Sequence, residues 1–213
     1  DPDIMMVWEI RDKETLDMAM ESAMTWHLVF STVHTNSAIE TISRILNLWA
    51  KPYMMAGTFD LVIAQRLARK TCIHCAKEID IKSDEKRQMA KKIFSNFDKD
   101  LLKKEIVSRG ITKEQWSRFM IEWKMLKWTG KLDGKQCPIC GGTWYKWRIG
   151  LFELMDYTDD IKNMLIEWKS NMEIEQYALK SWMIDLSRDG MFKTIKWLTD
   201  LDEIYRCVKM KHS

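Results

Sequence analysis

Four of the five cysteines in this 213-residue chain form two CxxC pairs, and the pairs constrain the fold more than any other feature. Cys72 and Cys75 form the first pair, and Cys137 and Cys140 form the second, after a spacer of 61 residues. Each pair can hold one edge of a tetrahedral Zn²⁺, and four thiolates complete a closed structural site. Unliganded cysteines are the main alternative to a zinc site. A redox-active CxxC is less favoured, because it would leave the second pair unexplained. The chain is therefore predicted to close a long loop around a zinc ion.

The overall composition is that of a globular chain, with 46% hydrophobic and 31% charged residues. A chain of this length can bury a core in one or two domains. No apolar run approaches the roughly 20 residues that a membrane helix needs, and the N-terminal residues lack the pattern of a signal peptide. The net charge of +3 is too small to indicate nucleic-acid binding by itself. These counts exclude a disordered or membrane-spanning protein.

The first 70 residues alternate between strand-like and helix-like patterns, which is typical of an α/β fold. Asp12 and Asn36 are the expected N-caps of the two helices, because a short oxygen-bearing side chain can accept from the free N–H groups of a first turn. The expected order is strand, helix, strand, helix, over residues 4–7, 13–24, 27–33 and 37–48.

Residues 76–136, between the two CxxC pairs, form a basic insert with 16 Lys and Arg against 10 Asp and Glu. We expect helices over 83–97 and 113–126, with breaks at Gly110 and at 129–135. Such a charge excess more often forms a solvated face than a binding site. After residue 149 the sequence predicts a short strand, followed by amphipathic helices over 159–167, 172–185 and 201–210.

Polar side chains follow both predicted strands of the N-terminal region. Glu9 follows the first strand, and His34, Thr35 and Asn36 follow the second. The carboxyl ends of parallel strands meet at one edge of a sheet, where ligands bind in open α/β folds. A carboxylate at that edge can organise Mg²⁺ or polarise an attacking water molecule. Each strand end alone is weak evidence for a site, but the two support each other.

Four motifs in order give the chain a resemblance to a known family. They are DPDIMMVWEIRDKET, HLVFSTVHTN, VIAQRLARKTC and CPICGGTWYKWRIGLFEL. The chain resembles the hexameric secretion-superfamily ATPases, which comprise the type IV pilus assembly and type II secretion motors. The resemblance covers nearly the whole chain except the insert. It implies an α/β fold, namely the C-terminal part of a RecA-like P-loop ATPase core with a tetracysteine zinc subdomain and a helical C-terminal region.

The resemblance also implies roles for single residues. Glu9 corresponds to the catalytic carboxylate of the Walker B element, and His34 to the histidine that senses the γ-phosphate region. Arg11, Thr35 and Arg66 are expected to contact the nucleotide. ATP, Mg²⁺ and Zn²⁺ are the implied cofactors. A homo-hexamer, a platform protein of the inner membrane and a cytoplasmic location at the inner face of that membrane are also implied, and no specific nucleic acid is expected as a partner.

The family's P-loop, GxxxxGK[ST], does not occur in these 213 residues, so we expect them not to hydrolyse ATP alone. The chain resembles the C-terminal half of a longer motor, and its four cysteines favour an assembly or secretion motor over a retraction motor. The expected division is an ATPase core over 1–71, a zinc subdomain over 72–148 and a helical region over 149–213.

Two other functions stay open from the sequence. The chain could be a catalytically decayed homologue of the motors. It could also be a zinc-stabilised binding module whose basic insert contacts nucleic acid or acidic lipid, with tryptophans stacking on bases.

The chain has 11 Trp but only 8 Gly, about half the usual glycine content of about 7%. Overpacking at a glycine position costs about 1 to 3 kcal/mol, so seven such replacements would exceed the whole stability of a domain, about 5 to 15 kcal/mol. We therefore hypothesise an alternative genetic code in which UGA encodes glycine and was translated as tryptophan. Trp116, in a helical stretch, is expected to be genuine. Against the family pattern, tryptophan stands where glycine is expected at Trp8, Trp26, Trp49, Trp144, Trp147, Trp182 and Trp197.

Overall fold

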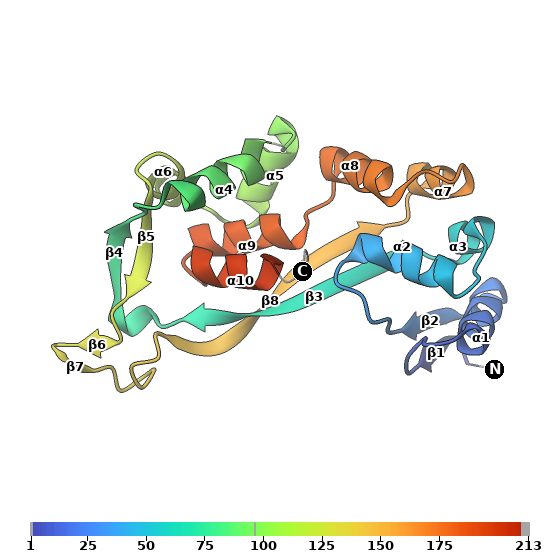
Figure 1. Ribbon diagram of the computed structural model, residues 1–213, viewed down its shortest axis with the longest axis horizontal. Coiled ribbons are helices and arrows are strands. Elements are labelled where there is room, and N and C mark those ends of the chain that lie inside the picture. Colours follow the sequence, from blue (N-terminus) through green and yellow to red (C-terminus); the bar gives the residue numbers. More distant parts are fainter. Residues whose placement is uncertain (1, 96, 210–213) are drawn as a thin grey trace. The chain divides into compact units, whose positions relative to one another are not determined.

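The alternation of strands and helices expected at the start of the chain is present, and the elements begin and end close to the expected residues. A computed structural model describes residues 2–95 and 97–209 (Figure 1). Its first elements are β1 (Ile4–Val7), α1 (Lys13–Met24), β2 (Leu28–Ser31) and α2 (Ala38–Asn47). β1 and β2 pair in parallel, from Ile4 opposite Leu28 to Val7 opposite Ser31. The α/β prediction for this region is therefore confirmed.

One of the two expected N-caps is confirmed and the other is wrong by one residue. The Asp12 side chain accepts from the Thr15 N–H at 2.9 Å, as expected for the cap of α1. The cap of α2 is Ser37 rather than Asn36, and its hydroxyl accepts from the Glu40 N–H at 3.4 Å. Ser37 has the extended backbone of a cap and lies directly before the first helical residue, whereas Asn36 lies one position too early to reach that turn.

The chain divides into two units, each built from two separate segments. Unit 1 contains Asp1–Ala64 and Glu153–Leu179, and unit 2 contains Gln65–Phe152 and Lys180–Ser213. The expected domain boundaries at residues 71/72 and 148/149 separate functional regions, whereas the two units are defined by packing. The expected domain boundaries therefore stay a prediction. No helix within the two described stretches is long and apolar enough to cross a membrane.

Unit 1 packs its helices through apolar residues at helical spacing. α3 (Pro52–Thr58) packs against α7 (Asp159–Ile166) and α1, and the unit also holds most of α8 (Asn171–Ser181). Phe59 and Tyr157 stack with their ring centroids 5.5 Å apart. Residues with at most 1% exposure form its core: Leu16, Ile42, Ile45, Met55, Met155, Ile161 and Ile174.

One face of the β1–β2 pair carries exposed apolar side chains. Ile4 and Met6 point to this face from β1, and their partners Leu28 and Phe30 extend it onto β2. Met6 is 83% exposed, and the other three are about half exposed or more. Parallel strands are normally covered on both faces. We call these four residues the exposed sheet face.

Unit 2 contains the insert and the last two helices. It also holds most of the long strands β3 (Leu61–Thr71) and β8 (Tyr145–Asp156), whose remaining residues belong to unit 1. The two strands are hydrogen-bonded neighbours, and η1 (Ile73–Cys75) follows β3. Antiparallel pairs are formed by β4 (Ala76–Asp80) with β5 (Lys124–Trp128), and by β6 (Lys131–Leu132) with β7 (Lys135–Gln136). The helices are α4 (Asp84–Ser95), α5 (Lys99–Ser108), α6 (Lys113–Met120), α9 (Leu186–Ile195) and α10 (Leu201–Lys209).

The helix expected over 113–126 is correct only in its first half. α6 ends at Met120, and the chain then enters β5, where it pairs with β4. Trp123 lies between these elements with φ 54°, a conformation that no α-helix can continue through. The helices α3, α5 and α9 were not expected from the sequence. The break at Gly110 is confirmed, since this residue follows the end of α5 with φ 61°.

An aromatic cluster fixes the insert onto α9. Phe192 of α9 meets Phe94 and Phe97 edge to face, each with ring centroids 5.7 Å apart. Trp116 of α6 joins the cluster against Phe94, with centroids 5.1 Å apart at 73°. Such pairs add to the hydrophobic term of burying the rings. The insert is therefore part of the core of unit 2 rather than a detached basic excursion.

We predict that Phe192→Ala lowers the free energy of unfolding by about 3 to 5 kcal/mol, because Phe192 is fully buried and its loss leaves a cavity among three rings. Urea unfolding followed by circular dichroism measures the change. Val107→Ala, at an exposed position of α5, is the matched control and should change stability by less than about 0.5 kcal/mol. An equal effect of the two variants would show that the cluster does not hold the insert.

Candidate functional site

The two CxxC pairs lie on turns close to the ends of the long strands β3 and β8. Cys72 directly precedes the short turn η1 that follows β3, and Cys75 is its last residue. Cys137 and Cys140 lie on the turn between β7 and β8, where the Gly141 N–H donates to the Cys137 carbonyl at 2.8 Å. The two turns are tied together, because the Cys72 N–H donates to the carbonyl of residue 144 at 3.0 Å.

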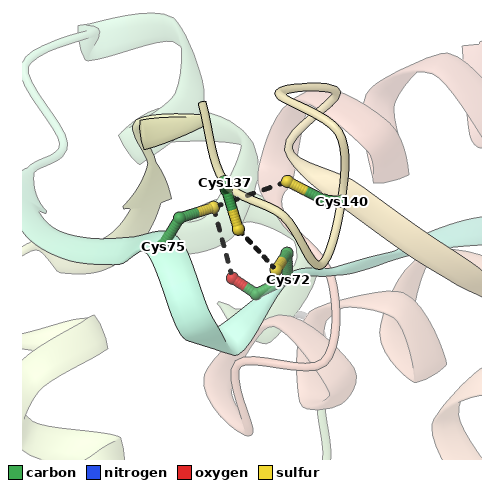
Figure 2. Close-up of side chains that lie close together, drawn as sticks. All are labelled: Cys72, Cys75, Cys137 and Cys140. Atoms are coloured by element: carbon green, nitrogen blue, oxygen red, sulfur yellow. Dashed lines mark hydrogen bonds between the residues drawn. The ribbon is translucent and has the colours of Figure 1, made fainter. Parts of the chain in front are cut away.

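The four sulfur atoms converge on one point (Figure 2). All of them lie within 4.8 Å of one another, with Sγ of Cys72 4.0 Å from Cys137 and Sγ of Cys75 3.7 Å from Cys140. These separations are too long for disulfides, which need about 2.05 Å. A tetrahedral zinc ion with Zn–S bonds of about 2.3 Å places its sulfurs about 3.8 Å apart. The predicted grouping of the four cysteines is therefore present, with the spacing that such an ion requires.

The environment of the four thiols fits a metal better than free cysteine. All four are buried and surrounded by apolar atoms, including those of Ala76 and Leu126. Burial raises the pKa of Cys75 to about 12, whereas N–H groups of its own turn, first that of Cys140, lower the pKa of Cys137 to about 7. His74 is exposed and outside the cluster, and Cys207 packs in a separate apolar cluster on α10. The donor set is thus four sulfurs, which suits zinc.

In unit 1, the strand ends bring Glu9 and His34 together. The loops that follow β1 and β2 are joined by two bonds, from the Ile10 N–H to the Thr32 carbonyl at 2.9 Å and from the Thr32 hydroxyl to the Trp8 carbonyl at 2.8 Å. With the loops fixed in this way, Nε2 of His34 lies 2.8 Å from Oε1 of Glu9.

The Glu9 carboxylate is held charged and partly unsatisfied. Its side chain is 7% exposed, and Oε2 lies 2.6 Å from Nη2 of Arg11. This hydrogen bond from Arg11 holds the pKa of Glu9 below its ordinary value, so Glu9 is ionised at neutral pH. Oε1 is buried and receives no aligned hydrogen bond from any described residue, despite the nearby imidazole. An ionised carboxylate oxygen in this position can accept a hydrogen bond from a water molecule or coordinate Mg²⁺.

Thr35 and Arg66, the other expected nucleotide contacts, make local hydrogen bonds. The Thr35 hydroxyl lies 3.0 Å from the Thr41 hydroxyl and donates to the Ser37 carbonyl at 3.2 Å, so it supports the start of α2. Arg66 lies partly buried on β3 in unit 2, where Nη1 donates to the Gln65 carbonyl at 3.3 Å. The roles of Glu9, His34, Arg11, Thr35 and Arg66 in nucleotide chemistry stay predictions.

Glu153 is a buried charged residue that the sequence reasoning missed. It lies on β8 and is fully buried, and its Oε1 accepts from the Ala38 N–H at 2.7 Å. Ala38 is the first residue of α2, so the carboxylate satisfies a free N–H at the positive end of that helix. The signal was present in GLFELM, where Leu151 and Met155 alternate with Glu153 on the buried face of the strand. A charge in such a position needs a buried partner.

A family model described as "Type II/IV secretion system protein" matches residues 1–206. Curated relatives match over nearly the whole chain. The type IV pilus assembly ATPase PilB of Pseudomonas aeruginosa is 33% identical over 209 residues, covering 98% of this chain and 31% of PilB. The type II secretion system protein HxcR of the same organism is 27% identical, covering 98% of this chain and 34% of HxcR. The chain thus spans about a third of the length of these relatives.

Solved structures share the fold at lower sequence identity. The ATPase DotB of Yersinia pseudotuberculosis superposes with a TM-score of 0.58 at 16% identity, covering 98% of this chain and 37% of DotB. The pilus retraction motor PilT, solved with bound ADP, gives a TM-score of 0.55 at 19% identity, covering 97% of this chain and 40% of PilT. At these identities the likeness shows a common α/β fold.

We predict that Glu153→Ala destabilises the protein by about 1 to 3 kcal/mol, because the buried Ala38 N–H loses its acceptor. Glu153→Gln should recover part of this loss, since an amide oxygen can accept the same bond. Thermal melting compares the melting temperatures of the unchanged protein and of the two Glu153 variants. Glu167→Ala, at an exposed carboxylate that follows α7, is the control and should melt like the unchanged protein. A Glu153→Ala variant as stable as the control would contradict the assignment.

Proposed function

The chain belongs to the type II/IV secretion system protein family, and we propose that it is the C-terminal part of a motor ATPase that drives type IV pilus assembly or a related type II secretion system. Its curated relatives are ATPases of pilus assembly and proteins of type II secretion. Five relatives at 31 to 33% identity are pilus assembly ATPases, which favours pilus extension.

One observation carries the proposal. The Glu9 carboxylate lies at the end of a parallel strand, is held ionised by Arg11, faces His34 at 2.8 Å and keeps one buried oxygen without an aligned hydrogen bond. This is the arrangement that a metal-assisted hydrolysis of a phosphoanhydride needs, because the carboxylate can accept a proton from water or orient the water bound to Mg²⁺.

The residues at this strand end would divide the work of hydrolysis. Glu9 orients the attacking water and accepts its proton, while Arg11 holds the carboxylate in place. His34 is largely exposed and within hydrogen-bond distance of Glu9, so it can link the carboxylate to the terminal phosphate of a bound nucleotide. Mg²⁺ bound with ATP would neutralise charge on the phosphate oxygens. Thr35 and Arg66 are further candidates for contact with the nucleotide.

The exposed sheet face supports the view that the ATPase core continues outside these residues. Ile4, Met6, Leu28 and Phe30 leave a parallel strand pair uncovered, and such pairs are normally buried on both sides. The relatives are about three times as long as this chain, and the sequence holds no P-loop. We infer that a RecA-like core with its P-loop is completed by that further part, and that residues 1–213 alone do not hydrolyse ATP.

The four cysteines would hold a structural zinc ion. Their four sulfurs are buried and lie within 4.8 Å of one another. Such a closed four-thiolate site stabilises a fold and does no chemistry. It would fix the turn after β3 to the turn before β8, at the base of the insert.

The assembly and location of the whole motor follow from the family. We propose a homo-hexamer that acts from the cytoplasm on a platform protein at the inner face of the membrane. The roles of the relatives in pilus assembly and type II secretion, together with the resemblance of the four motifs, support this assembly.

We predict that Glu9→Gln, made in the full-length protein, lowers kcat for ATP hydrolysis by at least about 10²-fold while ATP affinity stays nearly unchanged. The amide keeps the shape of the side chain but cannot take a proton. Phosphate release measures kcat, and a fluorescent nucleotide measures affinity. Glu14→Gln, at an exposed position of α1, is the matched control. Turnover retained by Glu9→Gln would refute the role of this carboxylate.

We predict one zinc ion per chain, measured by elemental analysis of the purified protein. Removal by a chelator should lower the melting temperature by at least about 5 °C, because binding energy of the metal is folding energy. Cys137→Ser should lose the zinc. Cys207→Ser, which removes the fifth cysteine outside the cluster, should keep it. A protein that contains no zinc and melts equally well with chelator would contradict the assignment.

A further inference from the structure

Nearly all non-glycine residues with left-handed backbone in this chain are tryptophans. Eight described non-glycine residues have positive φ, and one of them is Asp133, a residue type that tolerates this region. The other seven have φ between 54° and 73°, where a β-carbon clashes with the backbone. They are Trp26, Trp49, Trp123, Trp144, Trp147, Trp168 and Trp197.

Four of these tryptophans occupy the same position at a helix end. α1, α2, α7 and α9 each have tryptophan two residues after their last helical residue. The N–H of each tryptophan donates to the carbonyl three residues back, and the next N–H donates to the carbonyl five residues back, at 2.9 to 3.3 Å. This bonding defines the Schellman motif, whose left-handed residue is usually glycine.

The end of α5 shows the same motif with glycine at the left-handed position. α5 ends in the same pair of bonds, with the Gly110 N–H on the Val107 carbonyl and the Ile111 N–H on the Ile106 carbonyl, both at 3.0 Å. Its left-handed residue is Gly110, with φ 61°. Five helix ends therefore share one geometry, with glycine at one of them and tryptophan at four.

Four of the seven tryptophan side chains contribute little packing. Trp26 is 97% exposed, and Trp49, Trp147 and Trp168 are each more than 70% exposed. Tryptophan is normally among the more buried residue types. Each of these positions thus requires the backbone freedom of glycine and makes little use of the ring that is recorded there.

Two of the positions border the cysteine cluster. Trp144 follows Gly141 and Gly142, which also have positive φ, and its carbonyl accepts from the Cys72 N–H at 3.0 Å. Trp147 lies three residues further along β8 with φ 70°. The turn that carries Cys137 and Cys140 thus closes through a run of left-handed residues, for which glycine is the suited residue type.

Trp116 shows how a genuine tryptophan differs. It lies within α6 with ordinary helical backbone, and its ring packs edge to face against Phe94 at 5.1 Å. Trp8 and Trp182, also suspected from the sequence, have no positive φ, so the backbone adds nothing for or against them.

We propose that the protein made in its own cell has glycine at positions 26, 49, 123, 144, 147, 168 and 197, each encoded by a UGA codon that the cell reads as glycine. The structure extends the hypothesis to Trp123 and Trp168, where the sequence gave no reason for it. Adding seven glycines to the 8 recorded ones also brings the content to the usual level of about 7%. The inference concerns the identity of the residues and does not depend on the proposed function.

The direct test reads the gene and the protein together. The seven codons should be UGA and the Trp116 codon UGG. Peptides of the protein isolated from its source cells should contain glycine at the seven positions and tryptophan at 116 when sequenced by mass spectrometry. Tryptophan in the native peptides at those positions, or UGG in the gene, would overturn the proposal.

A second test measures the backbone effect in the purified protein. Trp26→Gly, Trp49→Gly, Trp168→Gly and Trp197→Gly should each raise the melting temperature, because glycine adopts positive φ without the clash of a β-carbon. Trp116→Gly is the matched control and should lower it, since a packed ring is lost and glycine weakens a helix. A lower melting temperature for all four helix-end variants would overturn the proposal.

Discussion

The convergence of four thiols is the constraint on which the rest of unit 2 depends. The turn after β3 and the turn before β8 meet within 4.8 Å at the sulfurs, and the whole insert leaves and returns through that point. Closing a loop of this length costs conformational entropy, which grows slowly with loop length. The aromatic cluster around Phe192 offsets part of that cost, and the proposed zinc ion would offset more of it at the base of the insert.

The candidate nucleotide site in unit 1 depends on a different device, the alignment of two parallel strand ends. The bonds between the loops after β1 and β2 set the distance between Glu9 and His34. Glu153 fixes the first turn of α2, which begins three residues after Thr35. These contacts preorganise only the side of the candidate site that carries Glu9 and His34. The exposed sheet face and the Glu9 oxygen without an aligned hydrogen bond fit the proposal that further groups complete this site.

Local sequence patterns were enough to predict several elements of the fold and the cysteine cluster. The features that they missed have little pattern of their own or depend on contacts between distant residues. β1, α1, β2 and α2 were predictable from apolar periodicity, and the cysteine cluster from its spacing. α5 and α9 were missed because short helices in a charged or interrupted pattern carry little period of their own. The buried role of Glu153 depends on contact with a helix 115 residues away, which no local pattern contains. The ends of α1, α2 and α7 were predicted to within one residue although tryptophan stands where glycine usually marks a helix end.

The central claim is that these residues form the C-terminal part of an ATP-driven motor. The most direct measurement compares ATP hydrolysis by residues 1–213 with hydrolysis by the full-length protein that contains the upstream part. The account predicts no turnover by the 213 residues and steady turnover by the full-length protein. Hydrolysis by residues 1–213 alone, or none by the full-length protein, would contradict it.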